Sequence, residues 1–209
     1  MTIKASSTPS SHDRILQAAK RLFAQQGYEN TSTVAIARDA GTSESQLMKH
    51  FGSKQGLLVA IFDRGWNAMS ARIQMIPQGS PADRLLAVLE AITLELENDS
   101  DLKVLSALEA RRVSKDSNVV LLGHGAHQFR KVIDRILEDM RNQGQIRADV
   151  NLDAVRAAIV GMAKGLWSDQ VVANRSDLPA NYNFEDVHKV LELLIGAFQE
   201  PTYRQAKAS

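Results

Sequence analysis

The stretch from Thr33 to Phe62 constrains the fold more than any other part of the chain. Two short segments with helical apolar spacing, 33–40 and 43–51, lie on either side of Ala40-Gly41-Thr42, and a longer apolar segment follows. Two short helices separated by a glycine turn are typical of the helix-turn-helix arrangement, which places its second helix in the major groove of DNA. A plain helical bundle with two short helices remains the alternative at this point, because a lone pattern of this kind has a high false-positive rate.

The rest of the chain also shows helical spacing, and no sustained alternation predicts a strand. Each of the five prolines falls where a helix would start or stop. Ser10 and Asp13 predict a capping box, Thr31 or Ser32 a second cap, and Gly27 and Gly41 helix ends. The sequence therefore predicts an all-α fold of about nine helices, at 13–26, 33–40, 43–51, from 53 onward, and at 81–98, 101–115, 118–143, 152–174 and 184–199.

The predicted helix-turn-helix has an apolar side and a polar side. We expect Val34, Ile36, Ala37 and Ala40, with Leu47 and Phe51, to pack on the apolar stripe of residues 15–23. The polar side can meet base edges and phosphates, and the helix N-termini at 31–33 and 53–54 can offer backbone N–H groups to phosphates. The candidate DNA contacts are Thr31, Ser32, Thr33, Ser43, Glu44, Ser45, Gln46, Lys49, His50 and Lys54.

Charge and composition agree with this prediction. Residues 1–65 hold eight Lys/Arg and five Asp/Glu, whereas the remainder is slightly acidic and the whole chain carries +1. A modestly basic N-terminal part permits nucleic-acid binding. With 44% hydrophobic residues the chain can build a core. The absence of cysteine, of a signal peptide and of a membrane-length apolar run predicts a soluble, cytoplasmic protein without a membrane span.

Many short matches through the first 60 residues lie in the register of one family. They are Ile15-Leu16-Gln17-Ala18-Ala19 with Leu22-Phe23, Gly27-Tyr28, Ile36-Ala37, Ala40-Gly41, Ser43, Leu47, His50-Phe51 and Ser53-Lys54. This pattern resembles the tetracycline-repressor (TetR) family, and Gly144–Val155 looks like the family's lead into its eighth helix. The resemblance implies an N-terminal arm (1–12), a helix-turn-helix DNA-binding domain (13–54), a helical ligand-binding and dimerisation domain (55–200) and a tail (201–209).

The same resemblance implies a transcriptional regulator, usually a repressor that a small molecule releases from DNA. We expect a homodimer on an inverted-repeat operator in double-stranded DNA, an unknown small-molecule effector and no cofactor. Two positions depart from the family pattern, which usually has Gly at Ser45 and a phosphate-contacting Tyr at Met48. A thioether cannot replace a phenol hydroxyl, so a phosphate contact at Met48 is not expected.

The larger domain carries weaker signals. Ala157, Gly161 and Gly165, at i, i+4 and i+8, form a smooth strip for another helix, either in a second subunit or within the same chain. With this strip, Val187, Leu191, Leu194, Ile195 and Phe198 complete the predicted dimer interface. By analogy with the family, the candidate pocket residues are Trp66, Met69, Leu108, Arg111, His124, His127, Phe129, Met162 and Trp167. Core filling is the alternative for the Trp and Met residues.

Other function classes find little support. His124 and His127 share a helix face but have no nearby carboxylate or Cys, so we predict no metal site. The motifs of zinc proteases, α/β-hydrolases, P-loop and dinucleotide-binding proteins are absent, which argues against a helical-bundle enzyme. A helical DNA-binding protein without a small-molecule ligand remains open, and a decrease in DNA affinity on ligand binding would separate the two.

Overall fold

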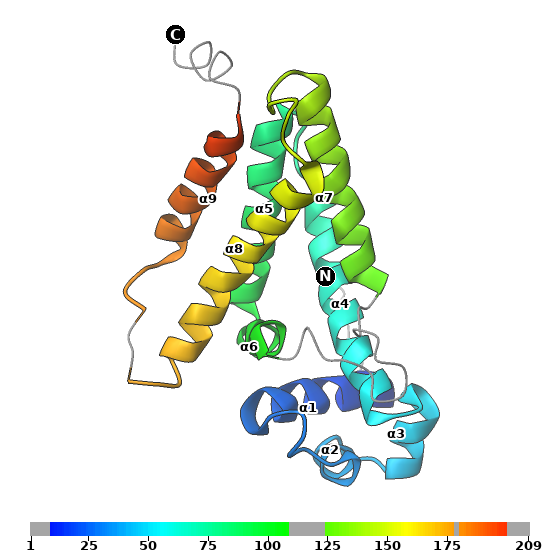
Figure 1. The fold of residues 1–209 in the computed structure, drawn as a ribbon. Coiled ribbons are helices and arrows are strands. Elements are labelled where there is room, and N and C mark those ends of the chain that lie inside the picture. Colours follow the sequence, from blue (N-terminus) through cyan, green and yellow to red (C-terminus); the bar gives the residue numbers. More distant parts are fainter. Residues whose placement is uncertain (1–8, 109–123, 178–179, 200–209) are drawn as a thin grey trace, which may run out of the picture.

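The computed structural model describes residues 9–108, 124–177 and 180–199, with side chains only from residue 127 in the second range. These residues form nine helices, and their only β pairing is an isolated bridge between Ile146 and Gln199. The prediction of an all-α fold is therefore confirmed (Figure 1). The helices are α1 (Ser11–Gln26), α2 (Thr33–Asp39), α3 (Glu44–Phe51), α4 (Lys54–Gln74), α5 (Pro81–Asn98), α6 (Ser100–Leu108), α7 (His124–Asn142), α8 (Leu152–Ala173) and α9 (Phe184–Phe198).

Helix ends follow the capping residues more closely than the apolar spacing. α1 begins at Ser11, two residues before the predicted start, because the Ser10 hydroxyl accepts a hydrogen bond from the backbone N–H of Asp13 (3.1 Å). The capping box is not closed, since the Asp13 carboxylate accepts from the Ser10 hydroxyl instead of its backbone N–H. The predicted ends of the helices at 101–115 and 118–143 lie partly outside the described residues.

The first three helices form a small unit around one apolar core. Ile15, Phe23, Ile36 and Leu47 are each at most 1% exposed, and each such side chain contributes roughly 1.5–3 kcal/mol through burial. Gly41 takes φ 62°, a left-handed conformation that ends α2 and redirects the chain into α3. The small unit therefore fixes the angle between the two helices of the motif.

One predicted core residue of this unit is placed wrongly. Val34 is 59% exposed, whereas its neighbours Ile36 and Ala37 are buried. A residue two positions before Ile36 lies about 200° around the helix from it, so Val34 faces outward.

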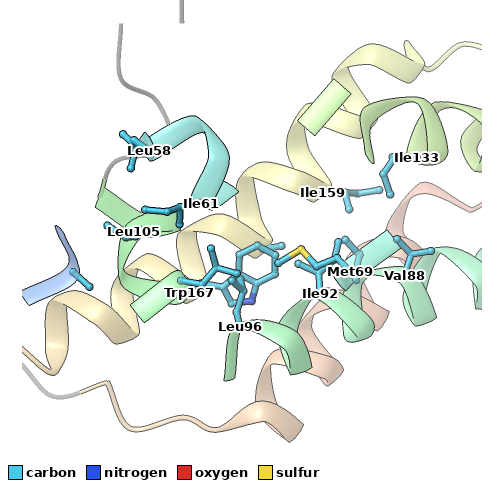
Figure 2. Close-up of a cluster of buried hydrophobic side chains, with 14 of the residues drawn as sticks. Leu58, Ile61, Met69, Val88, Ile92, Leu96, Leu105, Ile133, Ile159 and Trp167 are labelled. Atoms are coloured by element: carbon cyan, nitrogen blue, oxygen red, sulfur yellow. The ribbon is translucent and has the colours of Figure 1, made fainter. Parts of the chain in front are cut away.

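The larger domain is a bundle into which α4 runs from the small unit (Figure 1). Its core is almost entirely apolar, and Figure 2 shows side chains from α4, α5, α7 and α8 meeting in it, among them Met69, Ile92, Ile133 and Ile159. α6 lies between this bundle and α1 (Figure 1). Within the described residues, no helix has both the length and the apolarity that would let it cross a membrane.

Candidate nucleic-acid interface

The outward surface of α3 is the centre of the candidate interface. Leu47 is fully buried and Phe51 packs against the core, which orients the helix, while all the other residues of α3 are exposed. The Ser43 hydroxyl caps the helix by accepting from the N–H of Gln46 (3.3 Å). The residues of α3 that the sequence offers for base contacts therefore share one solvent-facing surface.

Several of these side chains already have partners within the chain. The Ser43 and Ser45 hydroxyls lie 2.9 Å apart, and the Thr33 hydroxyl donates to the Glu44 carboxylate, which ties the start of α2 to the start of α3. His50 is directed towards α1, where its Nε2 lies 3.2 Å from the Ser11 hydroxyl. These contacts position α3 on α1 and α2.

Gln46 and Lys49 are exposed, and no hydrogen bond or ion pair within the described residues engages either side chain. An amide that donates and accepts suits an adenine edge, and an ammonium suits guanine or phosphate. Lys54, a further candidate, lies at the start of α4, where its Nζ is 4.4 Å from the Tyr28 ring centroid and donates to the Glu29 carbonyl (3.3 Å). Within the described residues, Gln46 and Lys49 are thus the members of the predicted set whose side chains are most available to bind DNA.

Thr31 is a predicted DNA contact, but its side chain is buried. It is 1% exposed, and its hydroxyl donates to the carbonyl of Gly27 (2.8 Å), so it stabilises the turn after α1. Ser32, the neighbouring candidate, is exposed and caps α2 by accepting from the N–H of Ala35 (3.1 Å). Of the two caps that the sequence allows for α2, the structure selects Ser32.

Comparison with known proteins is consistent with this geometry. The family model for bacterial regulatory proteins of the tetR family matches residues 15–61, which contain the helix-turn-helix. A second model, the C-terminal region of YsiA-like proteins, matches residues 67–197, more than half of the chain. The chain belongs to the TetR family.

Relatives of this TetR-family chain are also regulators. The fatty acid metabolism regulator protein of Bacillus subtilis is 23% identical over 189 residues, which cover 87% of this chain and 92% of that protein. The repressor KstR2 of Mycolicibacterium smegmatis is 27% identical over 148 residues, covering 70% and 72% of the two chains. The solved structure of FadR from Bacillus subtilis in complex with stearoyl-CoA has a TM-score of 0.71 at 19% identity, covering 88% of this chain and 97% of that one.

In this TetR-family chain, polar contacts of α1 join the helix-turn-helix unit to the bundle. The Lys20 ammonium pairs with the Asp99 carboxylate at 2.5 Å, and the other oxygen of Asp99 accepts from the N–H of Leu102 in α6 (3.0 Å). Arg175, just after α8, donates to the carbonyl of Ala24 near the end of α1 (2.5 Å). A cavity of about 200 Å³ lies beside the Lys20–Asp99 pair, between α1, α4, α5 and α6.

The described side chains among the predicted pocket residues do not all face the interior. Met69 and Trp167 are buried in the bundle core (Figure 2), and Trp66 stacks on Phe129 with ring centroids 5.0 Å apart. Met162 is half-buried, while Leu108 and His127 are exposed, so these last two do not line the interior. Arg111 and the side chain of His124 lie outside the described residues.

One polar group in this interior is not predicted from the sequence. Thr93 of α5 is 1% exposed, accepts a hydrogen bond from the Trp167 indole N–H (3.2 Å) and donates to the carbonyl of Leu89 (2.8 Å). A lone Thr in an apolar helix gives no signal in the sequence that it meets a tryptophan 74 residues away.

The residues predicted for the dimer interface are exposed on α8 and turned inward on α9. Ala157, Gly161 and Gly165 are exposed, and a Cβ placed on either glycine would meet no described atom within 4 Å. Among the described helices, the strip therefore does not serve a crossing inside the subunit. The prediction for α9 needs correction, because its residues point the other way. Val187, Leu191 and Ile195 are buried in the subunit's own core, and Leu194 and Phe198 pack against that core.

Another stripe of α9 is exposed instead. Val190 is 39% and Leu193 is 74% exposed, and α8 adds Val172 at 48%. α8 and α9 lie side by side on one side of the bundle (Figure 1). Tyr182, just before α9, contacts α8: its hydroxyl donates to the Leu166 carbonyl (2.8 Å) and lies 3.0 Å from the Asp169 carboxylate. Burial and that carboxylate raise the pKa of Tyr182 to about 12.

No feature of the described residues suggests catalysis by a metal. In the part of the chain that the structure describes, no group of three or more His, Cys, Asp or Glu side chains could hold an ion. The acidic groups with displaced pKa values are surface ones: the Ser10 hydroxyl and then Arg64 lower the pKa of Asp13, and Arg147 lowers that of Asp149. Both are explained by local hydrogen bonds.

Proposed function

We propose that this chain is a repressor that binds an inverted-repeat operator as a homodimer and leaves it when a small molecule binds. The observation that carries the proposal is the surface of α3, where Gln46 and Lys49 stand exposed and uncommitted on a helix that its neighbours hold in place. In this proposal residues 13–54 bind DNA, and residues 55–200 bind the ligand and form the dimer.

Variants of these two residues separate base reading from phosphate binding. Lys49→Ala should weaken binding at every sequence and reduce the slope of log affinity against log salt by ~0.9 for each phosphate that is no longer neutralised, or ~1.8 for a dimer. Gln46→Ala should instead relax the preference at one base pair per half-site, at a cost of about 1–3 kcal/mol. Lys131→Ala, an exposed lysine on α7, is the matched control. An unchanged salt slope for Lys49→Ala would remove that residue from the phosphate-binding surface.

We propose that the dimer forms through the exposed stripe of α8 and α9, defined by Gly161, Gly165, Val172, Val190 and Leu193. Smooth glycine positions let another helix approach closely, and exposed apolar side chains beside them gain from burial. A two-fold axis along this stripe would present two copies of α3 to one face of DNA, where half-sites lie about 34 Å apart or a multiple of that distance.

We further propose that the effector has a substantial apolar part. The interior of the bundle is formed by side chains such as Met69, Ile92 and Ile159, and Thr93 with Trp167 is a polar pair among them. One relative is named as a regulator of fatty acid metabolism, and one similar structure contains stearoyl-CoA. Stearoyl-CoA and coenzyme A itself form a matched pair of test ligands, since they differ only by the acyl chain.

The test is a titration of the protein on its selected operator with each ligand. Stearoyl-CoA should lower operator affinity and change the fluorescence of Trp66 and Trp167, the only tryptophans in the chain, whereas coenzyme A should do neither. Equal operator affinity with every ligand that binds would argue for a DNA-binding protein without an effector. If only a polar ligand releases the protein from its operator, the proposal of a ligand-responsive repressor stands and the proposal of an apolar effector is refuted.

We propose that the effector acts on DNA binding through α6 and α1. α6 packs between the bundle and α1, and Asp99 holds both the first turn of α6 and Lys20 of α1. A displacement of α6 would therefore move α1 as a rigid body and change the separation of the two copies of α3. This requires that the ligand binds the two arrangements with different affinity.

A further inference from the structure

The DNA-binding unit exposes two large apolar side chains, and both lie on the helix-turn-helix. Among its described residues, 9–53, only Val34 of α2 (59%) and Met48 of α3 (42%) leave a large apolar side chain exposed. The other large apolar residues of this unit are buried or pack against the core. A single exposed apolar side chain is common on a protein surface, but on a helix that enters the major groove it can add an apolar contact with a base.

Met48 belongs to the outward part of α3 and not to its packing side. It directly follows Leu47, which is fully buried, and precedes Lys49, which is exposed. Successive side chains of a helix are rotated by about 100° around its axis. Gln46 and Met48 therefore lie on opposite sides of Lys49, which is at the centre of the exposed surface. The thioether and the amide therefore reach different base pairs when α3 lies in the groove.

Few side chains of α3 are available for a new interaction. Ser43 and Ser45 interact with each other, Glu44 accepts from Thr33, and His50 lies against Ser11. The remaining exposed groups are the amide of Gln46, the ammonium of Lys49 and the thioether of Met48. Each of the three has a distinct chemistry.

The chemistry of a thioether selects its partner in the groove. Its sulfur is a weak acceptor and has no proton to donate, so it gains little beside a phosphate or a base amide. It is polarisable and adapts its shape through three rotatable bonds. The apolar group that the major groove presents is the C5-methyl of thymine. We propose that Met48 reads a thymine methyl group in each half-site of the operator, an inference that rests on the proposed binding of α3 in the major groove.

The expected size of the effect follows from the area of one methyl group. Removing it from an apolar contact costs about 0.8 kcal/mol, which is about fourfold in affinity for one half-site and roughly 15-fold for both. The effect is confined to one position per half-site, because one side chain covers one methyl. Met48→Ala, at an exposed position, leaves the core of the small unit intact.

The experiment replaces each thymine of the selected operator by deoxyuridine, symmetrically in both half-sites and one position at a time, at fixed salt. Deoxyuridine removes the methyl group and keeps the pairing and the acceptor pattern. At one thymine position, the deoxyuridine duplex should bind the wild-type protein about 15-fold more weakly than the unmodified operator. Met48→Ala should lose the sensitivity at this position and keep any sensitivity to deoxyuridine at other positions. Met48→Leu should retain it. Met75→Ala is the matched control, since Met75 is 82% exposed at the end of α4.

A second pair of duplexes tests the methyl group directly. At the sensitive position, a C·G pair should bind less tightly than the same pair carrying 5-methylcytosine, and Met48→Ala should not distinguish the two. Unchanged deoxyuridine sensitivity in Met48→Ala, or an equal decrease in affinity on every duplex, would overturn the inference and place Met48 at the DNA backbone or away from DNA. Failure to select any operator would instead overturn the proposed function, and this inference with it.

Discussion

We expect one added methyl group near the start of α4, in Gly56→Ala, to weaken DNA binding strongly. A Cβ placed on Gly56 would lie 2.2 Å from the carbonyl oxygen of Phe51, the last residue of α3. That neighbour is backbone, so it cannot yield by changing a rotamer. Gly56→Ala must therefore shift the end of α3 relative to α4, or fail to form the junction.

Gly65 offers a comparison in the same helix. A Cβ there would lie 2.7 Å from a terminal methyl of Leu102, a side chain that can move. Overpacking costs about 1–3 kcal/mol, and alanine regains up to about 1 kcal/mol of helix propensity. We expect Gly56→Ala to lower the free energy of unfolding by about 2–3 kcal/mol and Gly65→Ala by about 1 kcal/mol or less.

The assays are thermal unfolding by circular dichroism and operator affinity by fluorescence anisotropy. For a chain of this size, about 2–3 kcal/mol corresponds to a fall in Tm of roughly 4–12 °C for the transition that includes the small unit. Operator affinity should fall by more than about tenfold for Gly56→Ala and change little for Gly65→Ala. Equal effects of the two substitutions, or an unchanged Tm and affinity for Gly56→Ala, would refute the close approach of α3 and α4.

Three further perturbations test other parts of the structure. Leu193→Asp should dissociate the proposed dimer, as seen by sedimentation, because it places a charge on the exposed stripe. Glu192→Asp should leave the dimer intact, and a dimeric Leu193→Asp would exclude this face. Lys20→Met should change the free energy of unfolding by no more than ~1 kcal/mol, because its ion pair with Asp99 is partly exposed. The same substitution should reduce the effect of ligand on operator affinity. A full ligand response in Lys20→Met would show that the ion pair does not couple the ligand to DNA binding. The pKa of Tyr182 is raised from 10.0 to about 12 in the folded state. Its contribution to stability is therefore complete below pH 10 and is lost as the pH rises towards 12. Tyr182→Phe should remove that part of the loss of stability at alkaline pH.

The helices were predictable because their signals are local. Ser32, Ser43 and Ser53 cap α2, α3 and α4, and each stands directly before an apolar-periodic segment. The prediction for α2 failed at Val34, since a seven-residue helix has too few residues for periodicity to fix which face is buried. The fold class is thus readable from the chain, and the orientation of its shortest helix is not.

Long-range contacts set the limit for the candidate site. α9 carries apolar residues on two sides, and the sequence does not say which stripe faces inward; packing on α5 and α8 buries Leu191 and leaves Leu193 outside. The ion pair between Lys20 and Asp99 and the bond between Trp167 and Thr93 join residues 79 and 74 positions apart. Such pairs depend on how helices cross, which no local pattern encodes.

Sequence-specific binding through α3 is tested most directly by selecting bound duplexes from a random double-stranded DNA library with purified protein at moderate salt. We expect an enriched inverted repeat whose half-site centres lie one helical turn of DNA apart, or a multiple of it, with the enrichment lost in Gln46→Ala at one base pair per half-site. Salt-sensitive retention of all duplexes without any enriched sequence would contradict sequence-specific binding through α3.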